Sequence, residues 1–99
     1  MDKKCGIYSY RNKINNKRYI GQSQRLNQRF NEHLCISYSP NHKDYQAVIH
    51  KAIRKYGIKN FEIEILEYCS PELLNEKEQY WINFYDSFKN GYNSNEGGG

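Results

Sequence analysis

The 99-residue sequence has little of what several protein classes require. It holds only three cysteines and two prolines, and no apolar run approaches the roughly 20 residues that span a membrane. The cysteines are odd in number and widely spaced, so they form no disulfide framework and match no zinc site. The opening residues MDKKCG lack the apolar run of a signal peptide. We therefore expect an intracellular protein of a reducing compartment, cytoplasmic or nuclear in type, without a membrane partner.

Acidic residues are scarce in the first part of the chain. Residues 1–60 hold thirteen Lys and Arg against three acids, a net charge of +10, whereas residues 61–99 hold two Lys against eight acids, a net charge of −6. A basic part with many of the ten tyrosines favours a polyanionic partner, and nucleic acid is the obvious one. The alternative, an uneven but merely solvated charge distribution, stays open.

Hydrophobic residues make up only 37% of the chain, so a single small domain with an aromatic-rich core is expected. Apolar periodicity predicts strands over residues 5–12, 17–22 and 60–69, and helices over residues 24–38, 45–57 and 71–86. The order β-β-α-α-β-α indicates an α+β fold, a small three-stranded antiparallel sheet flanked by helices. We expect this domain over residues 1–93, and a glycine-rich tail or the start of a linker over residues 94–99.

Two helix starts can be predicted from capping residues. Ser23 is a candidate N-cap for the first helix, in which Leu26, Phe30 and Leu34 share one face. Ser70-Pro71-Glu72 combines an N-cap, a proline in the first turn and an acid near the positive end of the helix dipole. The third helix is therefore expected to open there.

One acid interrupts the apolar face of the third helix. One row of that face holds Leu73, Tyr80 and Phe84, and the other holds Leu74, Glu78, Trp81 and Tyr85. A carboxylate among apolar side chains is costly unless it is paired or bound to a metal. Glu78 is therefore either a ragged edge of the stripe paired with Lys or Arg, or a ligand for a hard cation such as Mg²⁺.

Two helices carry groups that suit phosphate. Arg29 and His33 lie four residues apart on the first helix, where the arginine fork could hold a phosphate and the histidine a water or a proton. A surface arginine and an edge-packed histidine are the alternative. The second helix has a basic outer face suited to phosphate-backbone contacts or simply to solvation, made of His50, Lys51, Arg54 and Lys55.

Five elements along the chain resemble the GIY-YIG nuclease family in order and spacing. They are Gly6-Ile7-Tyr8, Tyr19-Ile20-Gly21, Arg29 in a helix, Glu78 in EKEQYWI, and NGYN ending at Asn93. The resemblance covers almost the whole chain, and the sequence is most similar to the N-terminal catalytic domain of a homing endonuclease. It implies a DNA endonuclease that hydrolyses phosphodiester bonds with one Mg²⁺ or Mn²⁺ ion per active site.

The resemblance also implies roles for single residues. Tyr8 is similar to the family's general base, Tyr19 to the tyrosine that places the nucleophile or phosphate, and Arg29 to the arginine that holds the scissile phosphate. Glu78 is similar to the sole carboxylate ligand of the metal. The family's site also has residues similar to His33 and Asn93, whereas no role is carried over to the segment His42-Lys43-Asp44.

A tyrosine has an unperturbed pKa of about 10, so Tyr8 would need the metal, Arg29 or a second phenol to lower it. The expected partner is DNA, with a separate or deleted DNA-binding domain, and the sequence requires no oligomer. A non-catalytic nucleic-acid-binding module is the alternative function. A zinc-binding structural domain is disfavoured by the spacing of the cysteines.

Overall fold

A computed structural model describes residues 4–97, so residues 1–3 of the expected domain and residues 98 and 99 of the expected tail lie outside it. Its elements are β1 (Gly6–Asn12), β2 (Arg18–Ser23), α1 (Leu26–Ser37), α2 (Val48–Tyr56), the 3₁₀ turn η1 (Ile58–Asn60), β3 (Phe61–Tyr68), the 3₁₀ turn η2 (Pro71–Leu73) and α3 (Leu74–Tyr85). This order, with an antiparallel three-stranded sheet, confirms the predicted α+β fold. Within residues 4–97 no helix combines the length and apolarity needed to cross a membrane.

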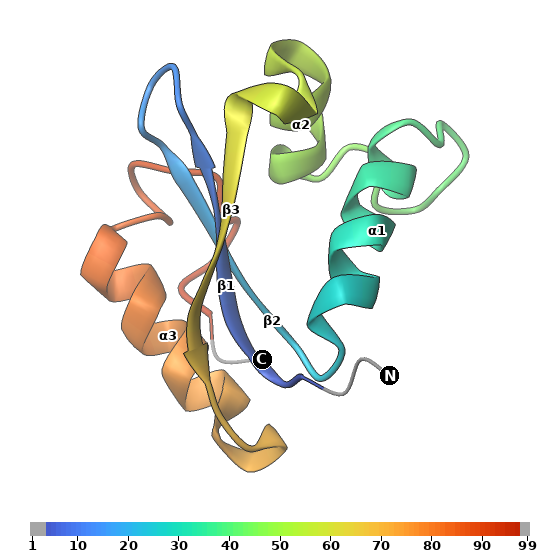
Figure 1. Ribbon diagram of the computed structural model, residues 1–99. Coiled ribbons are helices and arrows are strands. Elements are labelled where there is room, and N and C mark those ends of the chain that lie inside the picture. The colour runs from blue at the N-terminus through green and yellow to red at the C-terminus, as the bar shows by residue number, and fades with distance from the viewer. Residues whose placement is uncertain (1–3, 98–99) are drawn as a thin grey trace.

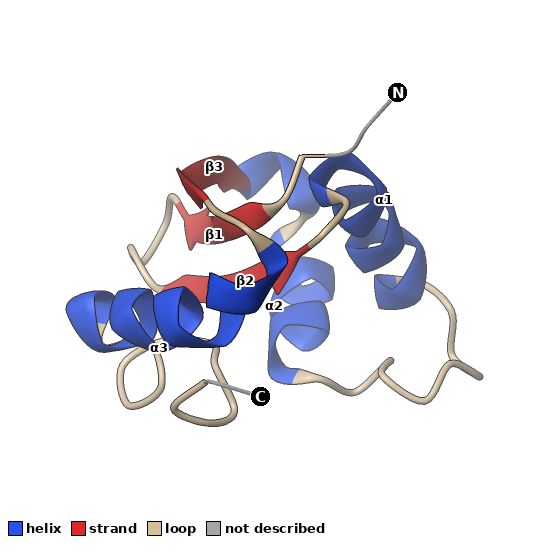
Figure 2. Cartoon of the chain, turned by 90° about the horizontal axis from the view of Figure 1, so that it is seen from below, coloured by secondary structure: helices blue, strands red, loops and turns tan. Residues whose placement is uncertain are grey.

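The sheet has the strand order β2-β1-β3, so β1 is central and β2 and β3 are its edges. Helices α1 and α2 cover one face and α3 covers the other (Figure 1), and the view from below shows the same three layers (Figure 2). Because both faces are covered, β1 is buried along almost its whole length. This explains why successive residues such as Ile7, Tyr8 and Tyr10 are all buried, instead of every second residue being exposed and polar.

Each face of the sheet has its own core. The core under α1 and α2 is built mainly from the tyrosines of β1 and from aliphatic residues of the helices, among them Tyr8, Tyr10, Leu26, Ile49 and Ile53. The core under α3 consists of Ile7, Ile20, Leu74 and Ile82. Among the described residues, every buried side-chain nitrogen and oxygen has a hydrogen-bond partner. The polar groups within these cores are therefore paired, which removes the cost of burying them alone.

Gly21 allows the β1–β2 hairpin to carry a tyrosine on its helix-covered face. Tyr8 pairs directly with Gly21 across the two strands. A Cβ atom at Gly21 would overlap the Tyr8 ring and its hydroxyl, so any side chain there would displace the phenol. Because Gly21 of the Tyr19-Ile20-Gly21 motif has no side chain, it leaves the space that the Tyr8 ring of the Gly6-Ile7-Tyr8 motif occupies.

The C-terminal segment covers part of the free edge of β2. Asn93 accepts a hydrogen bond from Ile20 N through Oδ1 and donates one to Ile20 O through Nδ2, both at 2.8 Å. The backbone N–H of Tyr92 donates to Arg18 O at 2.8 Å. Gly91 permits this approach, because a Cβ there would overlap the same Arg18 oxygen. Asn93 is therefore a clamp that holds residues 92–95 beside β2.

The start and one face of α1 differ from the prediction. The helix begins at Leu26, because Ser23 Oγ accepts a hydrogen bond from Arg25 N and forms a turn before the helix instead of its cap. Leu34 is 40% exposed, whereas His33 beside it is fully buried. The α1 face that meets the sheet is thus rotated toward His33, whose ring nitrogens find partners in the core.

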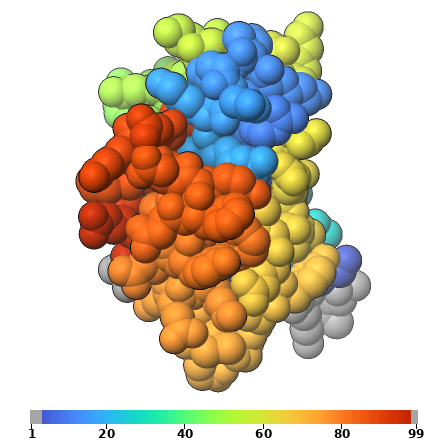
Figure 3. Space-filling view, turned by 90° about the vertical axis from the view of Figure 1, so that its left-hand side faces the viewer, coloured from blue at the N-terminus to red at the C-terminus, as the bar shows by residue number. Residues whose placement is uncertain are grey.

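The prediction for the third helix was wrong in two respects. Pro71–Leu73 form a 3₁₀ turn and α3 begins at Leu74, and Ser70 makes no side-chain cap bond. The row Leu73, Tyr80 and Phe84 is exposed, because Leu74 and Ile82 supply the buried contacts to the sheet. Figure 3 looks onto this outer side of α3, with the C-terminal segment beside it.

Candidate active site

A cavity of about 310 Å³ opens at the free edge of β2. It gathers most of the predicted site residues from five parts of the chain, and its lining includes Tyr19, Arg29, His33, His50, Glu78 and Asn93. Tyr8 is fully buried and is not part of the lining. Its ring lies next to that of Tyr19, with the two centroids 6.2 Å apart. The structure thus brings six residues to the cavity and sets Tyr8 behind them.

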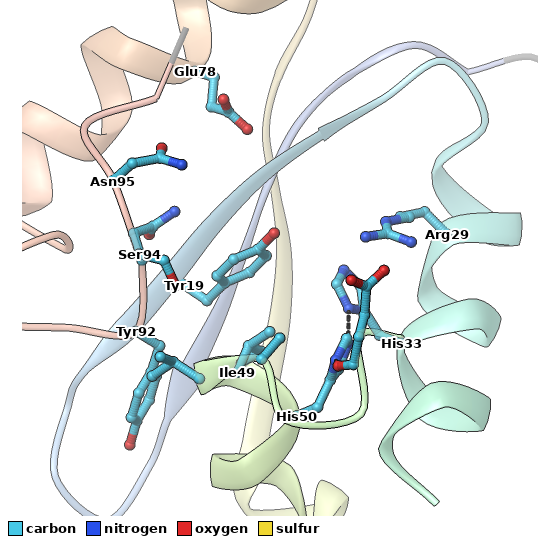
Figure 4. Close-up of a pocket in the computed structure, with 13 residues that line it drawn as sticks. Tyr19, Arg29, His33, Ile49, His50, Glu78, Tyr92, Ser94 and Asn95 are labelled. Carbon is cyan, nitrogen blue, oxygen red and sulfur yellow. Dashed lines mark hydrogen bonds between the residues drawn. The ribbon is translucent and has the colours of Figure 1, made fainter. Parts of the chain in front are cut away.

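The edge position of β2 lets groups from both faces of the sheet meet. Tyr19 projects on the side of α1, and Glu78 reaches the same opening from α3 (Figure 4). Gln22 Nε2 donates to Glu78 Oε1 at 3.2 Å and to Asn75 Oδ1 at 2.8 Å, which orients the half-buried carboxylate. In Figure 4, Tyr19 lies between Glu78 on one side and Arg29 on the other.

Arg29 supplies the positive charge of the cavity. Its Nη1 donates to Glu32 Oε1 at 3.2 Å, an ion pair within one turn of α1. Burial alone would lower the pKa of Arg29, but the Tyr8 hydroxyl and the Glu32 carboxylate raise it, so the guanidinium stays charged. The planar guanidinium of Arg29 has further N–H donors and lies beside an open cavity, so it is suited to bind a phosphate or carboxylate.

Behind the cavity, hydrogen bonds run in a line from the sheet to the loop before α2. The Tyr8 hydroxyl lies 2.6 Å from His33 Nε2, and His33 Nδ1 lies 2.8 Å from His50 Nε2. His50 Nδ1 lies 2.7 Å from the backbone oxygen of Asp44. This chain of four groups, which we call the histidine chain, connects β1 to α1 and α2.

Burial makes both phenols harder to ionise. It is the main cause that raises the pKa of Tyr8 well above its usual value, with Tyr19 adding to the shift and Arg29 only partly offsetting it. Burial likewise raises the pKa of Tyr19. The pKa of both tyrosines is therefore shifted upward, whereas a phenolate base would need a lower pKa. His33, whose pKa falls to about 3 through burial and then Arg29, is a neutral imidazole beside Tyr8.

The predicted basic outer face of α2 is only partly formed. Lys51 and Lys55 are exposed. The placement of His50 on this face is wrong, because its side chain is only 2% exposed and belongs to the histidine chain. Arg54 is also engaged: its Nη1 donates to Ser37 O at 2.9 Å and to Tyr45 O at 2.8 Å. Helical spacing alone could not show that the loop before α2 folds back over these two side chains.

Ser94, Asn95 and Asp44 also line the cavity, and no role was predicted for them. Ser94 and Asn95 follow directly after the Asn93 clamp, which holds them at the edge of β2. Proximity to NGYN is the only sequence signal for the first two. Asp44 comes from a long loop without periodicity, so its place depends on the contact of that loop with His50.

The donor set fits a hard cation with few protein ligands. Glu78 and Asp44 are the acids that line the cavity, and within residues 4–97 no three His, Cys, Asp or Glu side chains are grouped for a metal. A structural zinc ion needs about four such ligands. Mg²⁺ is commonly held by one or two carboxylates with water and phosphate oxygens, a set that Glu78 can start.

Comparisons with known proteins agree with this geometry. Residues 4–93 match the family described as GIY-YIG catalytic domain. The chain is 36% identical over 97 residues to "Probable intron-encoded endonuclease 1" of Neurospora crassa, covering 91% of this chain and 30% of that protein. It is 35% identical over 98 residues to "Intron-associated endonuclease 1" of Enterobacteria phage T4, covering 91% and 36%. The chain thus spans about a third of the length of these relatives.

Two solved structures share the fold. The catalytic domain of homing endonuclease I-TevI superposes with a TM-score of 0.78 at 32% identity, covering 91% of this chain and 97% of that one. A mutant of the catalytic domain of intron endonuclease I-TevI superposes with a TM-score of 0.81 at 30% identity, covering 94% and 95%. Fold and sequence therefore point to the same family.

The buried histidine predicts loss of stability in mild acid. His33 has a pKa of about 3 when folded and about 6.5 when unfolded, so the unfolded state binds more protons between these values. Stability is therefore lost as the pH falls through this window, by about 2 kcal/mol for His33 alone between pH 7 and pH 5. Urea unfolding at both pH values measures this, with His42→Gln as an exposed-histidine control that keeps the difference. Equal free energies of unfolding at the two pH values would contradict the burial of a neutral His33.

Proposed function

The chain belongs to the GIY-YIG catalytic domain family, and from this premise we propose that it is a divalent-metal-dependent endonuclease that hydrolyses phosphodiester bonds of DNA. The observation that carries the proposal is the cavity in which a charged Arg29 and a half-buried Glu78 face each other across Tyr19. Phosphodiester hydrolysis needs charge neutralisation and a positioned nucleophile in one place. The curated relatives, about three times as long, are both named endonucleases.

Arg29 holds the scissile phosphate in this proposal. Its guanidinium donates two parallel hydrogen bonds to the non-bridging oxygens, and its charge offsets the negative charge that develops in the transition state. The ion pair with Glu32 supports the role, because it fixes the arginine side chain on α1 without using all five donors. Removing such a group typically costs several kcal/mol of transition-state stabilisation.

Glu78 would hold one Mg²⁺ or Mn²⁺ ion. When bound, the ion supplies Lewis-acid stabilisation of the phosphate and the leaving oxygen. The hydrogen bond from Gln22 holds the carboxylate at the mouth of the cavity, so that one oxygen can bind the ion while the other keeps its donor. Asn93 acts indirectly, by keeping Ser94 and Asn95 on the same side of the cavity as Glu78, opposite Arg29 (Figure 4).

Tyr8 is proposed as the general base, acting without a free phenolate. For this step the attacking water has to reach the Tyr8 hydroxyl from the cavity past Tyr19, because Tyr8 itself is fully buried. The hydroxyl then gains the proton of the water while its own proton moves to His33 Nε2, 2.6 Å away. The water O–H bond breaks, a P–O bond forms from the water oxygen, and the bond from phosphorus to the 3′ oxygen breaks. The leaving 3′ oxygen takes up a proton from solvent and becomes a hydroxyl. Tyr19 lines the cavity and positions the water for this transfer. His33 is neutral at pH 7, so its Nε2 can serve as the acceptor in this transfer.

The rest of the DNA contact is proposed to be electrostatic. Lys51 and Lys55 are exposed on α2 and can contact backbone phosphates on one side of the cavity. Such contacts carry little sequence information, so we expect a separate part of the full protein to select the target. We propose that the protein acts inside the cell, with DNA as its partner and no oligomer needed to cut one strand.

Glu78→Ala should abolish cleavage while leaving DNA binding nearly intact. We expect nicking of a supercoiled plasmid in Mg²⁺, none in EDTA, and a loss of at least roughly 100-fold in rate for the variant, because the ion's charge stabilisation is gone. Glu76→Ala is the matched control, since Glu76 is exposed in the same helix. A folded parent protein that shifts DNA on a gel but never nicks it would favour the non-catalytic binding module instead.

Tyr8→Phe should remove the base while keeping the ring. We expect the nicking rate at saturating DNA to fall by roughly 10²–10⁴-fold, the usual contribution of general acid–base catalysis. Tyr10→Phe is the control, because Tyr10 is a buried tyrosine two residues along the same strand that faces the same core. Native rates for Tyr8→Phe would rule out the base role and transfer it to Tyr19 or to a metal-bound hydroxide.

A further inference from the structure

His50 lies at the end of the histidine chain, where its protonation is fixed by a group that cannot donate. Its Nδ1 is 2.7 Å from the backbone oxygen of Asp44. A carbonyl oxygen is only an acceptor, so Nδ1 of His50 must carry a hydrogen. A neutral imidazole has one such hydrogen, and therefore Nε2 of His50 has a free electron pair.

This assignment determines every other hydrogen in the chain. His50 Nε2 lies 2.8 Å from His33 Nδ1, so His33 must donate there and carry its hydrogen on Nδ1. His33 Nε2 is then unprotonated, and at 2.6 Å it accepts the hydroxyl hydrogen of Tyr8. The chain thus runs in one direction, from the phenol through two imidazoles to a carbonyl.

These hydrogen positions hold only for a neutral His50. The charged or titratable groups that face it are His33 and Arg29 from α1, Asp44 from the loop, and Arg54 one turn further along α2. Burial lowers the pKa of His50, and the two arginines add to this, whereas Asp44 opposes it. The net direction is downward, so His50 is neutral at pH 7. A cationic His50 would donate from Nε2 to His33 Nδ1, and the direction of the hydrogen bonds in the histidine chain would be reversed.

We propose that His50 is a positioning residue, which keeps His33 in the tautomer whose Nε2 can accept the proton of Tyr8. The inference rests on the proposed role of Tyr8 and deepens it. When Tyr8 gains the proton of water, its own proton forms a bond with His33 Nε2 and makes an imidazolium. That cation keeps its Nδ1–H bonded to His50. The proton returns to solvent after the product leaves, so no other reactant is needed.

Without an acceptor at position 50, the Nε2–H tautomer of His33 becomes more stable than the Nδ1–H tautomer. His33 is fully buried, and an Nδ1–H without a partner would be an unsatisfied donor. The hydrogen would move to Nε2 and be donated to the Tyr8 oxygen. His33 could then no longer accept the proton of the Tyr8 hydroxyl. A glutamine would preserve the native tautomer, because its amide oxygen accepts from His33 and its amide nitrogen donates to Asp44 O.

The test compares His50→Leu with His50→Gln in two measurements. The first is the ¹⁵N chemical shifts of the His33 ring, which report its tautomer without any nuclease assay. The second is the plasmid-nicking rate in Mg²⁺ at pH 7. We expect Nδ1–H of His33 in the parent protein and in His50→Gln, and Nε2–H or a mixture in His50→Leu. For His50→Leu we expect kcat to fall roughly 10- to 100-fold, with KM within about twofold, and for His50→Gln near-parent rates.

Three results would overturn the inference. They are an Nε2–H tautomer of His33 in the parent protein, an unchanged tautomer and kcat in His50→Leu, and a His50→Gln variant that keeps the tautomer but is as slow as His50→Leu. The last result would make His50 a proton acceptor itself. A parent protein that shows the Nδ1–H tautomer but never nicks DNA would contradict the proposed nuclease function alone and leave the tautomer assignment supported.

Discussion

A phenol buried at the centre of a sheet must find a hydrogen-bond partner, and Tyr8 finds it in His33. This single contact at 2.6 Å joins the central strand to α1. It decides which face of α1 turns inward, since His33 is buried in place of Leu34. It also requires a second partner for the imidazole, which α2 supplies through His50. The packing of both helices on this face of the sheet is thus tied to one hydroxyl group.

The candidate active site lies at the open edge of β2, next to the packed α1 and α2. In a sheet with order β2-β1-β3, only an edge strand lets side chains from both faces meet, and Glu78 reaches around this edge to the side of Tyr19 and Arg29. An open edge would normally invite pairing with another strand. Here the Asn93 clamp occupies part of it with side-chain hydrogen bonds, so the edge is covered without being closed.

Periodicity and the five motif elements were enough to predict the α+β fold, the family and the gathering of Tyr19, Arg29 and Glu78 in one cavity. They could not show which of several apolar-looking rows packs inward. Tyr80 and Phe84 are exposed because the narrow α3 contact is filled by Leu74 and Ile82. The inward turn of His50 depends on a carbonyl in the loop before α2, which no local pattern encodes. Tyr8 was expected at the cavity, yet the pairing with Gly21 holds it one layer behind.

We propose that one cavity holds a metal on Glu78 and a phosphate on Arg29 at the same time. A crystal structure of the Tyr8→Phe protein with Mn²⁺ and a short DNA duplex tests this directly, since anomalous scattering locates the ion. We expect one Mn²⁺ peak on the Glu78 carboxylate, with a backbone phosphate between the ion and the Arg29 guanidinium. An ion bound away from Glu78, or a DNA backbone that does not enter the cavity, would contradict it.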